Sequence, residues 1–349
     1  MTGTAELIGP ESTRWREVLG RVAHQIYHLP EYAVFDAELS GGRPVAFLYE
    51  EDGGSWLLPL VLRSVPGTDR LDAASPYGHP GPVSDRADEQ FWTRAVTALV
   101  RTLAASGAVS LFVRMDPLAW LPHGAFEQVG TLVPHGSTVS IDLRLSKEEW
   151  WPEVRRDHRS AINRAVRLGR TSVMDDWSHL DEFVAMYHQT MTRVGATEDY
   201  FFDRAYLERI RGALDGRVHL MMSLAADEPI AGSVFLETGG VVQAHIVATK
   251  PSYRREEPTR FLVSECVEWG RQRGCTDLHL GGGVGGREDS IFHFKKGFSR
   301  RRHEFFTFRA VLDPTAYAEL TSASQEPSPD VTGYFPAYRR PGEQPARPA

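Results

Sequence analysis

The sequence predicts an α/β protein of two domains, in which one arrangement of strands and a helix occurs twice. Its 349 residues exceed what a single compact core usually organises and suit two domains. Two hairpins with glycine turns, over residues 44–62 and 229–248, are each followed by an amphipathic helix, a glycine and a further strand. The shared order of four elements favours an internal duplication over a chance similarity of two α/β segments.

In both copies, glycines mark the turns and the helix ends, and the spacing of apolar residues marks the helices. Residues 52–54 and 238–240 turn the two hairpins, and Gly107 and Gly274 end the two helices. Apolar residues recur at helical spacing in each helix: Phe91, Ala95, Leu99 and Leu103 in the first, and Leu262, Cys266 and Trp269 in the second. A short apolar run after each glycine predicts the closing strand.

The domain boundary is expected near Ser140, which gives a first domain over residues 1–140 and a second over 141–320. The remainder, 321–349, is rich in Pro, Ser, Gln and Arg, and we expect it to be disordered. The second domain opens with Ser146-Lys-Glu-Glu149, a capping box that predicts the start of a helix running to about Leu168.

This predicted helix has one apolar and one arginine-rich side. The apolar arc holds Trp150, Val154, His158, Ala161, Ile162, Ala165 and Leu168. The opposite side carries Arg155, Arg156, Arg159, Arg167 and Arg170, with Arg164 at its edge. The arginine side is either a solvated charged surface or a stripe that faces phosphates, because the guanidinium fork suits bidentate phosphate binding.

Composition narrows the class of protein. The net charge of −7 argues against a bulk nucleic-acid binder, but residues 1–140 carry −6 of it and residues 141–349 only −1. A polyanion would therefore prefer local patches in the second half. The sequence shows no membrane-spanning run, no signal peptide and only two cysteines, too few for a disulfide framework or a cysteine zinc site. We expect a cytoplasmic protein.

The segment that stands apart chemically runs from His279-Leu-Gly-Gly-Gly283 to Asp289-Ser-Ile-Phe-His-Phe-Lys-Lys-Gly-Phe298. A strand that ends in three glycines allows close approach of a ligand, or forms a tight packing corner. Arginine outnumbers lysine 35 to 4, yet Lys295 and Lys296 are adjacent here between two phenylalanines. Either the lysines extend from a core edge, or a compact charge is required at this place. Neither a covalent nucleophile nor a metal site is indicated.

A second unusual segment, Ser75-Pro-Tyr-Gly-His-Pro-Gly-Pro-Val-Ser-Asp85, predicts a rigid loop in the first domain. It displays Tyr77, His79 and Asp85. The segment is either a functional loop or a linker with turn residues.

These three segments together resemble the Fem (FemABX) peptidyltransferases. Leu-Gly-Gly-Gly followed by Asp-Ser-x-Phe-x-Phe-Lys-x-Gly-Phe is similar to the C-terminal signature of that family, and the loop and the arginine-rich helix are also similar. The resemblance covers roughly residues 20–320. It implies two tandem GNAT-like domains, each a mixed sheet flanked by helices, and transfer of an amino acid from aminoacyl-tRNA to an amine of a peptide-like acceptor, such as a cell-wall precursor or a peptide or nucleoside antibiotic.

The resemblance also implies roles for individual residues. Lys295 matches the active-site lysine and Asp85 a first-domain acidic residue, and both are expected to be catalytic. Arg193 matches an arginine that contacts an acceptor phosphate. The expected substrate-binding residues are Phe294, Lys296, Tyr77, Arg193, Asp289 and Gly282, and the expected tRNA-binding residues are Arg155, Arg159 and Arg167. No cofactor or metal is expected, and the sequence does not predict the oligomeric state. The long helical hairpin carried by some family members is absent from the sequence.

Two other classes compete with this interpretation. An ordinary GNAT acyltransferase holds the pyrophosphate of acyl-CoA on the amides of a glycine-rich loop at a helix start. The equivalent segment here, residues 250–259, has no glycine and two adjacent acids, which makes a poor CoA site. A non-catalytic binding protein that kept the fold would be favoured by a degenerate Phe-Lys motif, and this motif is intact.

Overall fold

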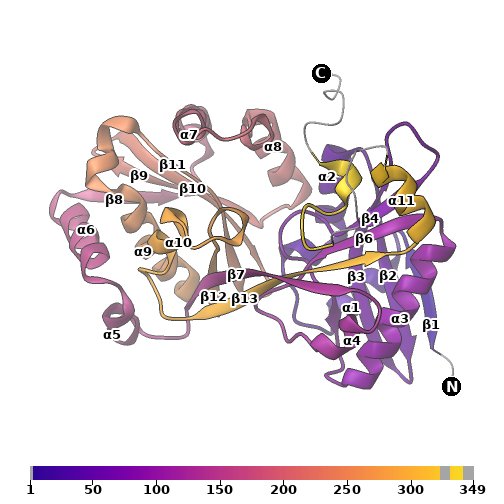
Figure 1. Ribbon diagram of the computed structural model, residues 1–349. Coiled ribbons are helices and arrows are strands. Elements are labelled where there is room, and N and C mark those ends of the chain that lie inside the picture. Colours follow the sequence, from indigo (N-terminus) through magenta and orange to yellow (C-terminus); the bar gives the residue numbers. More distant parts are fainter. Residues whose placement is uncertain (1–2, 323–330, 341–349) are drawn as a thin grey trace. The chain divides into compact units, whose positions relative to one another are not determined.

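The computed structural model describes residues 3–322 and 331–340, and the chain divides into two compact units (Figure 1). Unit 1 comprises Met1–His135 together with Glu304–Ala349, and unit 2 comprises Gly136–His303. This division differs from the predicted domains, because the chain returns to unit 1 after residue 303. A pattern of alternating residues predicts a strand but not the sheet that receives it, so the return was not visible in the sequence.

Unit 1 is built on a mixed sheet with the strand order β1-β2-β3-β4-β6-β13. Its strands are β1 (Thr4–Ile8), β2 (Arg43–Glu51), β3 (Gly54–Ser64), β4 (Leu71–Ala74), β6 (Ala108–Arg114) and β13 (Arg302–Val311), and the short β5 (Val83–Ser84) pairs with β3. β2 and β3 form the predicted hairpin, whose turn residues Asp52 and Gly53 have φ of 50° and 77°. β4 and β6 run parallel.

Helices cover both faces of this sheet. They are α1 (Thr13–Leu19), η1 (Ile26–His28), α2 (Pro30–Ser40), α3 (Glu89–Ala105), α4 (His123–Glu127), α11 (Pro314–Ser322) and η7 (Ala337–Arg339). α3 begins where the Asp88 carboxylate accepts the amides of Gln90 and Phe91, which satisfies two otherwise unpaired donors. Its apolar side is the one predicted from the sequence.

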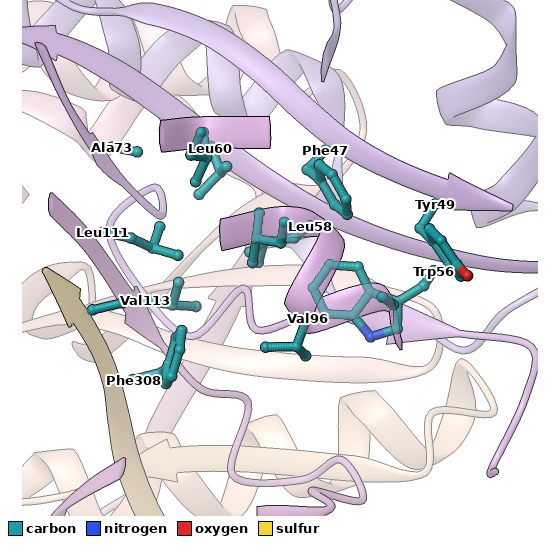
Figure 2. Close-up of a cluster of buried hydrophobic side chains, with 14 of the residues drawn as sticks. Phe47, Tyr49, Trp56, Leu58, Leu60, Ala73, Val96, Leu111, Val113 and Phe308 are labelled. Atoms are coloured by element: carbon teal, nitrogen blue, oxygen red, sulfur yellow. The ribbon is translucent and has the colours of Figure 1, made fainter. Parts of the chain in front are cut away.

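The main core of unit 1 lies between α3 and the sheet (Figure 2). Figure 2 shows Phe47, Trp56 and Leu58 from the hairpin beside Val96 of α3 and Phe308 of β13. The rings of Phe47 and Trp56 meet edge to face with centroids 5.8 Å apart. β13 is therefore an integral part of the first core, although it follows the whole of unit 2 in the sequence.

The C-terminal segment 331–340 packs on the other face of this sheet. Phe335 stacks on Tyr317 of α11 at 5.8 Å, and both rings are buried. The expected disorder from residue 321 therefore does not hold for residues 331–340, and Thr321 lies within α11. Residues 323–330 and 341–349 of that predicted tail lie outside the described residues.

Asp72 of β4 connects this segment to the sheet. Its carboxylate is completely buried and accepts hydrogen bonds from Arg63, at 2.9 Å, and from Arg339. The hydroxyl of Tyr338 adds a third, at 3.2 Å. Burial of a carboxylate is costly unless it is paired and hydrogen-bonded, and here two guanidinium groups and a hydroxyl supply the partners.

Asp116, just beyond β6, is a buried acid with no guanidinium or ammonium among the partners that the structure gives it. Its carboxylate accepts the Leu118 amide at 2.8 Å and the Gln25 side-chain amide. Burial raises the pKa of Asp116 to about 7, and the two hydrogen bonds oppose this rise. The folded state therefore holds a proton that the unfolded chain, with a carboxyl pKa near 3.8, has already lost above about pH 4.

We expect Asp116→Asn to flatten the pH dependence of stability. Because the pKa is raised on folding, the contribution of Asp116 to stability falls as pH rises from about 4 to about 7. When the pH rises from 5 to 8, the wild type should lose on the order of 2 kcal/mol of its free energy of unfolding relative to the variant. Urea unfolding at both pH values checks this, and an equal difference between the two proteins at pH 5 and pH 8 would contradict it.

Unit 2 repeats the plan of hairpin, helix and parallel strand. Its sheet has the order β7-β12-β11-β10-β9-β8, with β7 (Thr131–Asp142), β8 (Arg170–Met174), β9 (Val218–Ala225), β10 (Glu228–Thr238), β11 (Val241–Thr249) and β12 (Asp277–Gly281). β10 and β11 form the second predicted hairpin, and β11 pairs in parallel with β12 only from Val241 to Gln243. The buried core lies on the side of α9 (Pro258–Gln272), and α7 packs against β10 and β11.

The remaining helices of unit 2 range from 3 to 15 residues in length. They are α5 (Lys147–Trp150), η2 (Trp151–Glu153), α6 (Arg156–Arg167), η3 (Trp177–His179), α7 (Leu180–Val194), η4 (Glu198–Tyr200), α8 (Arg204–Ala213), η5 (Pro251–Glu256), η6 (Val284–Gly286) and α10 (Ser290–Lys295). The capping box of Ser146 and Glu149 forms as expected. The single predicted helix is nevertheless divided into α5, η2 and α6, because Val154 and Arg155 adopt extended backbone after Pro152.

Candidate active site on unit 2

Lys295 ends helix α10, and its ammonium lies at the C-terminal end of β12. The Nζ atom donates a hydrogen bond of 2.6 Å to the carbonyl oxygen of Gly282. Burial lowers the pKa of Lys295 to about 8, against the opposing influence of the Asp289 carboxylate. At neutral pH the side chain is therefore mostly a charged donor, but its pKa lies well below the ordinary lysine value.

The three glycines that precede α10 allow this approach. Gly281 has φ of 75°, and a Cβ atom there would lie 3.3 Å from the Lys295 ammonium nitrogen. A Cβ atom at Gly282 would lie 3.0 Å from the Ser137 carbonyl oxygen, and one at Gly283 would lie 2.0 Å from the Arg287 carbonyl oxygen. At each of these three positions, a side chain would closely approach another part of the chain. The glycines therefore agree with the tight packing corner, one of the two alternatives for this segment. This corner places Lys295 at the strand end.

Asp289 shapes the same corner as the N-cap of α10. One oxygen of its carboxylate accepts the Phe292 amide, and the other accepts the Val284 amide, each at 2.9 Å. The cap explains why residues 290–295 form a helix rather than a continuation of extended chain. The predicted substrate-binding residues Asp289 and Gly282 therefore hold the loop and Lys295 in place.

Lys296 lies in different surroundings from Lys295. It follows the last residue of a helix, where successive side chains are about 100° apart. Its ammonium lies 5.5 Å from the centre of the Phe292 ring. Phe294, one residue before Lys295, packs against His158 of α6 with ring centres 5.5 Å apart.

A cavity of about 610 Å³ lies beside α10 and the start of α6, and we refer to it as the basic cavity. Its cationic lining residues are Arg155, Arg156, Arg159, Lys296, Arg300 and Arg302. Only two carboxylates, those of Glu153 and Glu288, line it as well. Such an excess of cations favours a ligand with several negative charges.

The cations of the basic cavity differ in how far they are already paired. Arg155 is held by a bidentate ion pair with Asp157, at 2.5 and 2.9 Å. Arg159 donates to the Trp151 carbonyl oxygen at 3.2 Å, whereas Arg156 and Arg300 are exposed. The structure thus brings Arg155 and Arg159 of the predicted tRNA-binding set to the cavity, while Arg167 lies exposed further along α6 and does not line it.

Two arginines at the C-terminal end of the arginine-rich side contact another segment of the chain. Arg164 donates to the carbonyl oxygens of Arg255 and Glu256, and Arg170 pairs with the Glu256 carboxylate at 2.7 Å. Arg260, on α9, pairs with Glu257. These contacts fix the segment between β11 and α9 and correspond to the structural alternative for this part of the stripe.

The predicted first-domain residues lie in unit 1. The Asp85 carboxylate accepts the Ser55 amide at 2.7 Å and lies 3.7 Å from Arg21, so its contacts hold the loop to β3. Tyr77 is 46% exposed and lines a cavity of about 370 Å³. The Arg114 guanidinium lies over its ring, 5.4 Å from the ring centre.

Arg193 belongs to unit 2 and lies at the exposed end of α7. Partial burial and the nearby Arg254 guanidinium lower the pKa of the Arg193 guanidinium.

Four residues of the site are not among those that the sequence assigned to it. Arg156 stood in the predicted stripe but was not assigned to tRNA, and Arg300 and Arg302 were not singled out, although the run of three arginines at 300–302 directly after the Phe-Lys motif was a usable signal. His158 was counted only as part of an apolar arc. Its contact with Phe294 joins segments too distant in sequence for spacing to show.

Comparison with known proteins defines the class. Residues 152–296 match the family model described as an acetyltransferase (GNAT) domain. With the repeated plan of both units, this gives the chain the fold of two tandem GNAT-like domains, as predicted.

The chain is similar to FemX, whose crystal structure superposes on it with a TM-score of 0.69 at 15% sequence identity. The superposition covers 90% of this chain and 99% of FemX. L-PGS from Bacillus licheniformis follows with a TM-score of 0.53 at 14% identity, covering 87% of this chain and 93% of L-PGS. The C-terminal domain of a putative lysylphosphatidylglycerol synthetase from Agrobacterium fabrum gives 0.52 at 12%, covering 89% and 94%. At these identities the likeness establishes the fold, and it confirms the Fem-like resemblance at that level. No curated protein matches the sequence.

Neither a cluster of metal ligands nor a helix that could span a membrane is found in the part of the chain that the structure describes. Among residues 3–322 and 331–340, no group of three or more His, Cys, Asp or Glu side chains is arranged to hold a metal ion. Within the same residues, no helix combines the length and the apolar character that crossing a bilayer requires.

Proposed function

We propose that this protein transfers an amino acid from aminoacyl-tRNA to an amine of a peptide-like acceptor and so forms an amide bond. The observation that carries the proposal is the placement of Lys295. The lysine of a Fem-like Phe-Lys motif is half-buried at the glycine-rich end of β12, and the same helix end contributes Lys296 to the basic cavity. A charged donor and one cation of the basic cavity thus lie at the end of one short helix.

The chemistry requires little more than positioning and charge. The acceptor nitrogen forms a bond to the aminoacyl carbonyl carbon, the ester bond to the ribose oxygen breaks, and the proton lost by the amine passes to that oxygen. Negative charge develops on the carbonyl oxygen as the amine attacks. The Lys295 ammonium already donates one N–H to Gly282, and it has two further N–H groups to direct at that charge.

Acyl-CoA is disfavoured as donor by the start of α9. A pyrophosphate-binding helix start offers free backbone amides and a positive end. Here Pro258 removes the first amide, and the preceding residues Glu256 and Glu257 place two carboxylates at this end. These carboxylates are held by Arg170, Arg164 and Arg260, so the local cations are already paired.

Dependence on tRNA and not on CoA is the decisive expectation. The purified protein is incubated with total charged tRNA and a panel of amine acceptors, and products are identified by mass spectrometry. We expect product that disappears when RNase is added and that acetyl-CoA does not replace. Turnover supported by acetyl-CoA and unaffected by RNase would overturn the proposal in favour of an ordinary GNAT acyltransferase.

A further inference from the structure

The ring of His158, on α6, is enclosed by the residues that flank the candidate catalytic lysine. Its side chain is completely buried, with ring centres 4.4 Å from Phe298 and 5.5 Å from Phe294. The two phenylalanines also touch each other at 5.2 Å. One imidazole therefore contacts the residue before Lys295 and a residue just after Lys296.

Gly297 completes the enclosure. A Cβ atom at this position would lie 2.2 Å from a carbon of the His158 ring, closer than any real contact, so the ring occupies the place of the missing side chain. The pattern Phe-Lys-Lys-Gly-Phe thus has a packing partner for its first, fourth and fifth residues. All three contacts are to one side chain from another helix.

The polar edge of His158 faces Arg155, which also holds the end of α10. The Nη2 atom of Arg155 lies 3.2 Å from His158 Nε2 and can only donate, so Nε2 accepts and the proton of the neutral ring is on Nδ1. Arg155 donates its backbone amide to the Gly297 carbonyl oxygen at 2.7 Å and a guanidinium N–H to the His293 carbonyl oxygen at 3.2 Å. Arg155 therefore joins the start of α6 to the residues around Lys295 by two hydrogen bonds.

The ring is uncharged at neutral pH. Burial and the nearby Arg260 and Arg155 guanidinium groups lower the pKa of His158 to about 4, and only the Asp157 carboxylate opposes them. His158 is therefore unsuited to proton transfer at neutral pH, and its contribution is steric.

From this geometry we infer that His158 is a positioning residue for Lys295: its ring fixes the end of α10 so that the ammonium stays half-buried at the end of β12. The inference rests on the proposed role of Lys295, because a positioned lysine matters to the reaction only if that lysine acts in it. Without the ring, Phe294 and Phe298 lose their shared partner, and Lys295 should become more hydrated.

The experiment measures the protonation of Lys295 directly in the full chain, without tRNA or acceptor. N-hydroxysuccinimidyl acetate labels amines in their neutral form, and peptide mass spectrometry quantifies labelling at each of the four lysines over a pH series from neutral to alkaline. The wild type should show a midpoint near 8 at Lys295. We expect His158→Ala to raise this midpoint by at least one unit toward the ordinary lysine value, with unchanged midpoints at Lys147 and Lys250.

Matched variants separate positioning from general loss of stability. Val267→Ala removes a completely buried side chain of α9 from the same core and should leave the Lys295 midpoint within half a unit of the wild type. His158→Phe restores an aromatic ring and should recover most of the shift. If His158→Ala does not fold, His158→Leu keeps apolar volume without the ring and should still raise the midpoint.

Two results would overturn the inference: an unchanged Lys295 midpoint in the folded His158 variants, or an equal shift in Val267→Ala. In the tRNA-dependent assay, His158→Ala should lower kcat with little change in the KM for charged tRNA. Absence of any transfer by the wild type would refute the proposed function alone, since the labelling result does not depend on turnover.

Discussion

Replacing Lys295 by Ala is expected to lower the single-turnover rate of aminoacyl transfer about 100-fold, which corresponds to about 3 kcal/mol of transition-state stabilisation. The ammonium is held by Gly282 at the strand end, in a half-buried site where a charge acts more strongly than in water. The substitution removes a side chain at a helix end and should leave the fold and the acceptor affinity largely intact.

The pH dependence sharpens this expectation. Because the pKa of Lys295 is lowered to about 8, its charge is present at pH 7 and lost as pH rises through 8. The ratio of wild-type to Lys295→Ala rates should therefore shrink toward one above about pH 9, whereas deprotonation of the acceptor amine affects both proteins alike and cancels. A ratio that stays constant from pH 7 to 9.5 would show that the charge is not what Lys295 supplies.

Lys296 is the internal control for the chemical step. It differs from Lys295 by one position, and its ammonium lies by Phe292 and the basic cavity instead of the glycine corner. Lys296→Ala should weaken tRNA binding moderately and leave the single-turnover rate within a few fold of the wild type. If neither substitution lowers the single-turnover rate, or if Lys296→Ala lowers it more than Lys295→Ala, the assignment of the catalytic lysine is wrong.

Removing Arg156, Arg159 and Arg300 together is expected to weaken tRNA binding by about 100-fold at low salt. The three side chains line the basic cavity and are not held in carboxylate pairs, in contrast to Arg155. Removal of one phosphate contact should reduce the slope of log affinity against log salt by roughly 0.7 to 0.9, so a triple alanine variant should lower it by about 2. Fluorescence titration at several salt concentrations measures both quantities.

Arg167 provides a control on the same helix. It is exposed, carries the same charge and lies outside the lining of the cavity. Arg167→Ala should change the slope by less than one third as much as the triple variant. A change of one third or more would favour phosphate contact along the whole arginine side, the alternative that the sequence left open. If neither variant changes the slope, both groups of arginines belong to a solvated charged surface.

Local patterns predicted most of the elements because each depends on neighbouring residues. The two glycine-turned hairpins, helices α3 and α9 and the capping box of α5 occur where the sequence placed them. The break between α5 and α6 was missed because one apolar arc continues across Pro152 and conceals the interruption. The helix at 290–295 was missed because lysines between phenylalanines fit a strand equally well, and only the Asp289 cap decides between them.

Contacts between segments that are distant in the sequence could not be predicted, for a different reason. Nothing local to residues 302–311 distinguishes a strand that extends one sheet from a strand that returns to another, yet β13 pairs with β6. Likewise, the apolar arc correctly placed His158 inside, but its contact with Phe298 depends on how α6 packs against the segment that follows α10. The sequence thus located the candidate lysine and part of the arginine surface, and the structure supplied the residues that support them.

The fully buried Asp72 carboxylate has a practical consequence for work with this chain. Two of its three hydrogen-bond donors, Tyr338 and Arg339, come from the last described segment, so shortening the chain before residue 331 would strip a buried anion of one of its two cations. Uncompensated charge in an apolar setting is among the most destabilising changes a domain can suffer. Expression work on unit 1 should therefore retain residues 331–340 and place purification tags at the other end or beyond them.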